Sequence, residues 1–227
     1  MPKTFVLSVG GSLIVPAIGI DVNFLRHFRS LILKQVRAGH KFYLIIGGGA
    51  TARQYIKAAQ GVIKLQAGPR DWLGISATRL NAQLIKTIFG SWAHDEIIID
   101  PTKKIKTTKN IIIISGYQPG ASTDYATVLI AKHNGANTVI NLSNIDYAYD
   151  KDPRQFTDAK KLKQVAWPEF QKIVGTKWRP GLNAPFDPIA SRAAAKNGLK
   201  VIIINGRKIK NLTACLAGGK FKGTIIS

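Results

Sequence analysis

The chain has 227 residues, of which 45% are hydrophobic, and a formal net charge of +21 at pH 7. Its length allows a sizeable core, and its hydrophobic content excludes bulk disorder. The single cysteine, Cys215, excludes an intramolecular disulfide framework, and the apolar sequence around it predicts a buried structural thiol. No apolar run approaches the roughly 18 residues of a membrane span, and the first residues do not read as a signal peptide. We therefore expect a cytoplasmic protein.

The positive charge is distributed over several groups. Residues 188–227 contain eight Lys or Arg and no Asp or Glu. Two further groups are Lys103, Lys104, Lys106 and Lys109, and Lys160, Lys161 and Lys163. No aromatic residues interleave with these groups as stacking platforms for bases. A basic surface that attracts anionic nucleotides explains the charge, and direct nucleic-acid binding is kept as an alternative.

The apolar pattern alternates between short buried strands and amphipathic helices. Strands are expected over residues 5–9, 42–46, 96–100, 111–115, 138–142 and 200–205. Helices are expected to begin at Asp21, near Thr51, at Asp71, at Thr123 and at Asp187, which precedes Pro188. Continuous apolar strands separated by helices predict an α/β fold, a three-layer αβα sandwich around a mostly parallel central sheet. The sequence contains no linker or repeat, so residues 1–227 should form one domain.

Glycine-rich or polar segments follow four of these strands. They are Gly10-Gly11-Ser12, Gly47-Gly48-Gly49, residues 116–120 and Ser143-Asn144. Parallel strands end at one edge of a sheet, where ligands bind, and glycine lets the backbone approach a phosphate closely. Each segment alone is more typical of a turn, but several at one edge indicate a phosphate site.

Signatures of other enzyme classes are absent from the sequence. It has no Gly-x-x-x-x-Gly-Lys-Ser/Thr loop and no complete Gly-x-Gly-x-x-Gly segment that opens a βαβ unit. The four histidines lack metal-ligand spacing, and no Gly-x-Ser-x-Gly elbow is present. These absences disfavour hydride transfer, zinc chemistry and serine hydrolysis.

Six segments together resemble the amino-acid kinase superfamily, and within it the archaeal-type UMP kinases. They are residues 9–13, 46–53, 71–81, 116–124, 144–153 and 186–188. The most specific are the Asp-x-x-Gly-x-x-x-Thr-x-x-Asn segment from Asp71 to Asn81 and the Gly-Tyr-Gln-Pro-Gly loop at 116–120. The resemblance spans nearly the whole chain and implies one amino-acid kinase-like domain.

The resemblance also implies two adjoining nucleotide sites. For ATP it implies Gly10, Gly11, Ser12, Gly49, Arg53, Ser143, Asn144, Tyr149 and Asp152. For UMP it implies Gly48, Asp71, Tyr117, Gln118, Pro119, Gly120, Ala121, Ser122 and Thr123. The residues implied for catalysis are Arg53, which would bridge two phosphate groups, and Asp187, which would orient cations. From chemistry alone, Asp71 and Asp187 are also suited to be plain helix N-caps.

The reaction implied is direct in-line transfer from ATP to UMP, with Mg²⁺ carried by ATP and no metal held by protein ligands. The resemblance further implies a homo-oligomer, generally a hexamer. The sequence departs from the family at Ser8, where many members have a lysine, and at Tyr147, where glycine is usual. Lys177 and Arg179 are candidates for the missing cation, although solvent-exposed charge explains them as well.

Two alternative functions are kept. One is a kinase for another acceptor, such as carbamate or isopentenyl phosphate, although kinases of the latter usually have a histidine after the second glycine loop. No histidine lies between Gly49 and Gln60. The other alternative is a non-catalytic protein that binds nucleotides or RNA, which the absent lysine and the high charge favour slightly.

Overall fold

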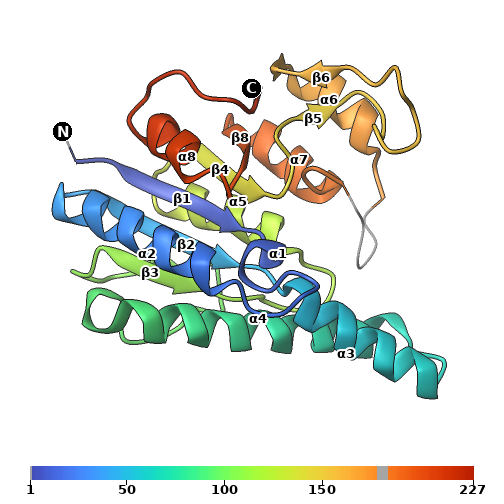
Figure 1. Ribbon diagram of the computed structural model, residues 1–227, viewed down its shortest axis with the longest axis horizontal. Helices are drawn as coiled ribbons and strands as arrows, with labels where there is room; N and C mark the ends of the chain where they lie inside the picture. The colour runs from blue at the N-terminus through green and yellow to red at the C-terminus, as the bar shows by residue number, and fades with distance from the viewer. Residues whose placement is uncertain (1, 178–183) are drawn as a thin grey trace.

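A seven-stranded sheet forms the centre of the fold in the computed structural model, which describes residues 2–177 and 184–227 (Figure 1). The strand order is β3-β2-β1-β4-β8-β9-β7, and only the pair β8 and β9 is antiparallel. The strands are β1 (Thr4–Val9), β2 (Lys41–Ile46), β3 (Ile111–Ile114), β4 (Thr138–Ser143), β7 (Gln164–Val165), β8 (Lys200–Asn205) and β9 (Thr224–Ile226). A separate antiparallel ribbon joins β5 (Ala148–Tyr149) to β6 (Lys161–Leu162).

Helices cover both faces of this sheet, which gives the expected three layers (Figure 1). One face is covered by α1 (Gly11–Ile14), α2 (Val22–Arg37), α4 (Ala67–Phe89) and α8 (Ile209–Leu216). The other is covered by α5 (Thr123–His133), α6 (Trp167–Val174) and α7 (Pro188–Lys196). Helix α3 (Gly49–Val62) packs against α4 and extends beyond the sheet (Figure 1), and a 3₁₀ turn, η1 (Gly90–Trp92), follows α4.

The register of the sheet brings the strand ends to one edge. Val9, the last residue of β1, is level with Ile46 of β2 and with Leu142 of β4. The side chains of β1 alternate, so Leu7 and Val9 enter one core while Val6 enters the other. The segments that follow β1, β2 and β4 therefore begin side by side at the carboxyl edge of the sheet.

Aromatic packing fixes the helices of the first face. Phe24 stacks on Phe28 within α2, and Phe28 meets Phe89 of α4 edge-on at 6.5 Å between ring centroids. Burying each such ring contributes about 1.5–3 kcal/mol. Cys215 is buried on the same face, and burial raises the pKa of its thiol to about 11, which confirms a structural thiol.

Most of the expected elements are confirmed, including the caps of two helices. The Asp21 carboxylate accepts a hydrogen bond from the Phe24 N–H, and the Asp187 carboxylate accepts bonds from the Ile189 and Ala190 N–H groups. The described helices include none that is long and apolar enough to cross a membrane.

Two sequence expectations were wrong. Asp71 does not begin a helix, because α4 begins at Ala67 and places Pro69 in its first turn. The first-turn N–H groups of a helix have no intrahelical partners, so proline is tolerated there. Residues 96–100 do not form a strand, and only an isolated bridge joins Ile98 to Ile114. That segment continues the irregular chain after Trp92 along the outer side of β3.

Candidate active site

The first two glycine loops interlock at the carboxyl edge of the sheet. The Gly10 N–H donates to the Leu142 carbonyl at 2.9 Å, and the Gly47 N–H donates to the Val9 carbonyl at 3.0 Å. A Cβ atom on Gly11 would lie 2.0 Å from the backbone nitrogen of Gly49, which itself has φ = +62°. Side chains are therefore excluded at both glycines, and the two loops present bare backbone to a ligand.

A buried side chain of helix α4 supports the second glycine loop, residues 47–49. The Asn81 side-chain amide is buried and donates hydrogen bonds to the carbonyls of Gly47 and Gly48, at 2.9 and 3.0 Å. These bonds satisfy two carbonyls that the close packing removes from water. Asn81 therefore fixes the direction in which the backbone of the loop points.

The same helix holds the loop that follows β3. The Thr78 hydroxyl accepts a hydrogen bond from the Gly116 N–H at 2.7 Å and donates to the Ile75 carbonyl at 2.6 Å. Nearly two turns earlier in α4, the Asp71 carboxylate accepts a bond from the Gly120 N–H at 2.8 Å. Residues 71, 78 and 81 thus tie one helix to two separate loops.

Two carboxylates meet where α5 and α7 begin. Asp187 is buried, and its carboxylate accepts from the Ile189 N–H at 2.7 Å, from the Ala190 N–H at 2.8 Å and from the Ser122 hydroxyl. The Asp124 carboxylate accepts from the Asp187 N–H at 3.2 Å and from the Ser8 hydroxyl at 3.3 Å. Within the described residues, the hydrogen-bond donors to this pair are backbone N–H groups and hydroxyls, with no Lys or Arg among them.

This arrangement changes the acidity of Asp124. Burial, followed by the charge of Asp187, raises the pKa of the Asp124 carboxyl to about 7. Hydrogen bonds from the Asp187 N–H and the Ser8 hydroxyl act in the opposite direction and are outweighed. Ser8 stands where the resemblance expects lysine, so a hydroxyl contacts Asp124 where an ammonium group would have neutralised it.

The segments after β4 and β5 form the side expected to hold the ATP base. The Ser143 carbonyl accepts from the Gly206 N–H at 2.9 Å, which fixes the end of β4 against the end of β8. Tyr149 belongs to β5. The Asp152 carboxylate is engaged by Arg154, whose hydrogen bonds hold the pKa of Asp152 at about 2. A ribose hydroxyl at Asp152 would have to share that carboxylate with the guanidinium.

Most expected site residues follow the carboxyl ends of the strands or lie in the first turns of the helices next to them. Asp71 lies one turn inside α4, and Tyr149 and Asp152 lie on the separate ribbon and its loop. Direct hydrogen bonds bring Asp71 to Gly120 and Ser122 to Asp187, and Gly11 packs on Gly49. Arg53 is exposed on α3. Lys177 is also exposed, whereas Arg179 lies outside the described residues. Tyr147, at the usual glycine position, lies 5.7 Å beneath the Lys161 ammonium.

Residues 3–205 match the amino acid kinase family. The chain belongs to this family. The uridylate kinase of Methanospirillum hungatei is 32% identical over 227 residues, covering 99% of this chain and 94% of that protein. The uridylate kinase of Pyrococcus abyssi is 33% identical over 226 residues, covering 97% and 98%. The crystal structure of uridylate kinase from Archaeoglobus fulgidus matches with a TM-score of 0.83 at 28% identity, covering 100% of both chains.

Three residues of this amino acid kinase domain were not assigned a role from the sequence. Thr78, Asn81 and Asp124 lie within matched segments, yet only their contacts reveal what they hold. For Thr78 and Asn81 a signal was available in the sequence: they are polar and three residues apart on a helix face that is otherwise buried. Asp124 gave no such signal, because an acidic residue in the first turn of a helix is common.

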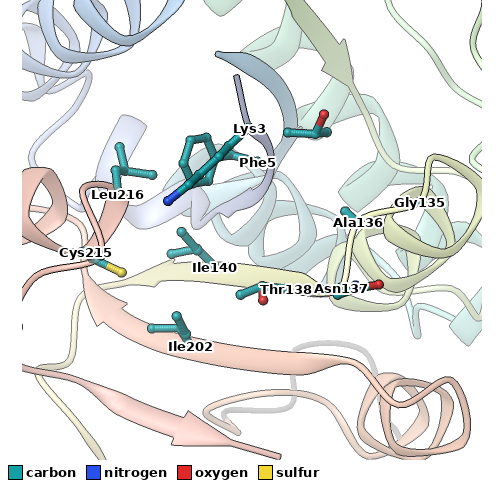
Figure 2. Close-up of a pocket in the computed structure, with 12 residues that line it drawn as sticks. Lys3, Phe5, Gly135, Ala136, Asn137, Thr138, Ile140, Ile202, Cys215 and Leu216 are labelled. Atoms are coloured by element: carbon teal, nitrogen blue, oxygen red, sulfur yellow. The ribbon is translucent and has the colours of Figure 1, made fainter. Parts of the chain in front are cut away.

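A hollow of ≈ 530 Å³ lies at the opposite edge of the sheet, away from these residues (Figure 2). Its lining includes Lys3, which precedes β1, together with Phe5 of β1 and Thr138 of β4, which lie at the start of their strands. Its position separates it from the glycine loops by the length of a strand, so it is not the phosphate site.

Proposed function

We propose that the chain transfers the γ-phosphoryl group of ATP to UMP and releases UDP and ADP. Family membership and similarity to archaeal uridylate kinases support an ATP-dependent phosphotransferase. The observation that carries the choice of UMP is the helix α4, whose Asp71, Thr78 and Asn81 hold two loops at once. These residues belong to the segment that most specifically resembles UMP kinases.

In the proposed ATP site, the phosphates lie against the backbone of Gly10, Gly11, Ser12 and Gly49. N–H groups in the first turns of helices α1 and α3 provide donors without a side chain in the way. The adenosine lies towards Ser143, Asn144, Tyr149 and Asp152. Mg²⁺ arrives as part of the ATP substrate and neutralises charge on the transferring group.

In the proposed UMP site, the Asp71 carboxylate holds the ribose hydroxyls, while Gly48 contacts the phosphate. The loop 117–123 surrounds the uracil and the phosphate, and the Gly120 N–H bond to Asp71 fixes this loop relative to the ribose. A carboxylate has several acceptor positions, so Asp71 would accept from both ribose hydroxyls and keep its bond from the Gly120 N–H. The site would therefore select for an intact ribose.

The proposed transfer needs no covalent intermediate. The UMP phosphate oxygen attacks in line, and the protein contributes position and positive charge. Arg53 lies at the start of α3, near Gly49, and would approach both phosphate groups. Asp187 would orient cations around the reacting centre from the N-terminus of α7, where two backbone N–H groups fix its carboxylate.

We also propose that the chain acts as a homo-oligomer. Helices α3 and α4, with the residue that follows α3, expose large apolar side chains, namely Tyr55 (62% exposed), Val62 (84%), Ile63 (59%), Trp72 (49%) and Leu80 (61%). An apolar surface of this kind is typical of a protein interface. Light scattering on the purified chain should give a multiple of 24.7 kDa, and Val62→Asp together with Leu80→Asp should lower it. A monomeric parent would contradict this part of the proposal.

The test is an assay of ADP release with ATP and Mg²⁺, offering UMP, CMP, AMP, carbamate and isopentenyl phosphate in turn. We expect turnover selective for UMP and its loss in Arg53→Ala. Arg26→Ala is the matched control, because Arg26 is exposed on α2. Turnover of another acceptor would replace UMP by that substrate. Binding of UMP without turnover of any acceptor would favour a non-catalytic nucleotide-binding protein.

A further inference from the structure

The edge of the sheet opposite the glycine loops is strongly basic. The segments that lead into β1, β2, β3, β4 and β8 are residues 2–4, 34–41, 107–110, 132–138 and 196–200. They contain no Asp or Glu. Their cations, defined here as the basic edge, are Lys3, Lys34, Arg37, Lys41, Lys109, Lys132, Lys196 and Lys200. Because the register aligns Thr4 with Lys41 and Thr138 with Lys200, these cations border one side of the molecule.

Few acidic residues lie near this edge. Asp95 and Glu96 are the ones on the side of β3, because they follow Ala93, which is bridged to Ile111 at the start of that strand. The ion pairs among the described residues join Lys103, Lys151, Arg154, Arg207 and Lys208 to carboxylates, and none includes a member of the basic edge. Lys41 and Lys109 instead donate to the carbonyls of Thr107 (3.3 Å) and Ser91 (2.7 Å). On the side of β8, Glu169 lies two residues after Trp167, whose indole N–H donates to the Leu199 carbonyl at 3.0 Å.

These charges are too far away to serve phosphoryl transfer. Strand β1 has six residues, which span about 20 Å between the two edges. The Debye length at physiological ionic strength is about 8 Å, so the basic edge is screened from anions bound at the glycine loops. The nucleotide substrates of the proposed kinase therefore do not account for this face.

The basic edge also carries an exposed aromatic ring and a concave surface. The Arg37 guanidinium lies 5.5 Å from the centre of the Trp92 ring, which is 40% exposed. Trp92 and Arg37 are 55 positions apart in the sequence, so only the fold brings them together. The hollow of ≈ 530 Å³ between Lys3, Phe5 and the start of β4 opens on this same edge (Figure 2).

We propose that the basic edge binds the phosphodiester backbone of single-stranded RNA, with Trp92 as a surface on which a base stacks. A row of cations without carboxylate partners attracts a polyanion, and a guanidinium stacked on an exposed ring is suited to a base rather than to an acidic protein surface. The site is separate from the kinase site, so the RNA-binding proposal does not depend on the identity of the phosphoryl acceptor.

The test measures fluorescence anisotropy of a short labelled single-stranded RNA, with excess UMP present to occupy the kinase site. We expect a dissociation constant in the micromolar range at low salt, as for other binding through the backbone. Contacts to four phosphates would give a slope of about −2.8 for log K against log salt, a loss of about 50-fold between 50 and 200 mM. Anionic phospholipid vesicles serve as a competing polyanionic surface.

Two variants carry equal changes of charge at different places. The edge variant combines Lys3→Gln, Lys34→Gln, Lys132→Gln and Lys200→Gln, all at exposed side chains. The distal variant combines Lys64→Gln, Lys104→Gln, Lys163→Gln and Lys210→Gln, which are also exposed. We expect the edge variant to bind RNA roughly tenfold or more weakly with a shallower salt slope. The distal variant should bind like the parent, and both should keep their melting temperature and kinase activity.

A third variant tests the contribution of the Trp92 ring to RNA binding. Trp92→Leu keeps an apolar group beside Arg37 but removes the ring, and it should weaken RNA binding without changing the salt slope. Equal weakening by the edge and distal variants would overturn the proposal, because binding would then follow net charge alone. Absence of RNA binding at low salt, or displacement of RNA by vesicles that bind more tightly, would overturn it as well.

Discussion

The backbone N–H of Asp187 donates a hydrogen bond to the carboxylate of Asp124 over 3.2 Å, so the two acidic residues share one network at the beginnings of two helices. The two carboxylates accept hydrogen bonds from different sets of donors. Asp187 caps α7 and receives two further N–H bonds, which stabilise its charge. Asp124 accepts from one N–H group and from the Ser8 hydroxyl, and burial beside Asp187 raises the pKa of its carboxyl to about 7.

The stability of the protein should therefore depend on pH through Asp124. Its pKa is raised from 3.8 to about 7 on folding, so the folded state binds the proton more tightly than the unfolded chain. The resulting stabilisation is fully present below pH 3.8 and is lost as the pH rises to about 7. Asp124→Asn should remove this loss and raise the free energy of unfolding at pH 8 by at most about 4 kcal/mol, at roughly 1.4 kcal/mol for each unit of pKa change. Urea denaturation over this pH range measures it.

The matched control for that experiment is Asp150→Asn, because Asp150 is exposed. It should leave the difference in stability between pH 5 and pH 8 as in the parent. A pH dependence that persists in Asp124→Asn would show that groups other than Asp124 cause it.

A cation at position 8 should lower the raised pKa of the Asp124 carboxyl. The Ser8 hydroxyl lies 3.3 Å from the Asp124 carboxylate at the end of β1, so Ser8→Lys brings an ammonium group to the pair. An opposite charge within hydrogen-bond reach lowers the pKa of a carboxyl by about 1 to 3 units. We expect the pH dependence of unfolding to move to lower pH. Ser8→Met introduces a side chain of similar size to lysine but without charge, so it should leave the pH dependence of unfolding where it is in the parent.

The sequence was sufficient to predict the layers of the fold, because the periodicity of buried strands and helices is local. It located the helix caps at Asp21 and Asp187 for the same reason, since a cap needs only the residues that follow it. The start of α4 could not be obtained in this way. Asp71 has the features of a cap, and only the partner loop at Gly120 shows that its carboxylate is used elsewhere.

Features that depend on contacts across the chain were missed. The strand β9 has three residues, and only its pairing with β8 in the folded sheet identifies it as a strand. The stacking of Arg37 on Trp92 likewise joins residues that are 55 positions apart in the sequence. Most residues expected at the nucleotide sites lie towards the carboxyl edge of the sheet. The supporting role of Asn81 could not be predicted, because it depends on the positions of two buried carbonyls.

Replacement of Asn81 should destabilise the protein and its phosphate loop together. Asn81→Leu leaves the Gly47 and Gly48 carbonyls without their donor, at a cost of about 2 to 4 kcal/mol in the free energy of unfolding. The KM values for both UMP and ATP should rise, because the loop lies between the two proposed sites. Asn23→Leu, at an exposed position of α2, is the control and should change neither quantity. Destabilisation with unchanged KM values would show that the loop keeps its shape without Asn81.

Removal of the Asp71 charge should affect one substrate only. Asp71→Asn keeps an oxygen that accepts the Gly120 N–H, so the loop stays in place and the melting temperature changes little. The amide is a weaker acceptor for ribose hydroxyls than a carboxylate, and losing a charged hydrogen bond costs about 1.5 to 3 kcal/mol, so the KM for UMP should rise about tenfold or more. The KM for ATP should stay constant. Asp95→Asn, at an exposed position, controls for the loss of a negative charge. If the KM values for UMP and ATP rise by the same factor, Asp71 supports the loops and does not bind the ribose.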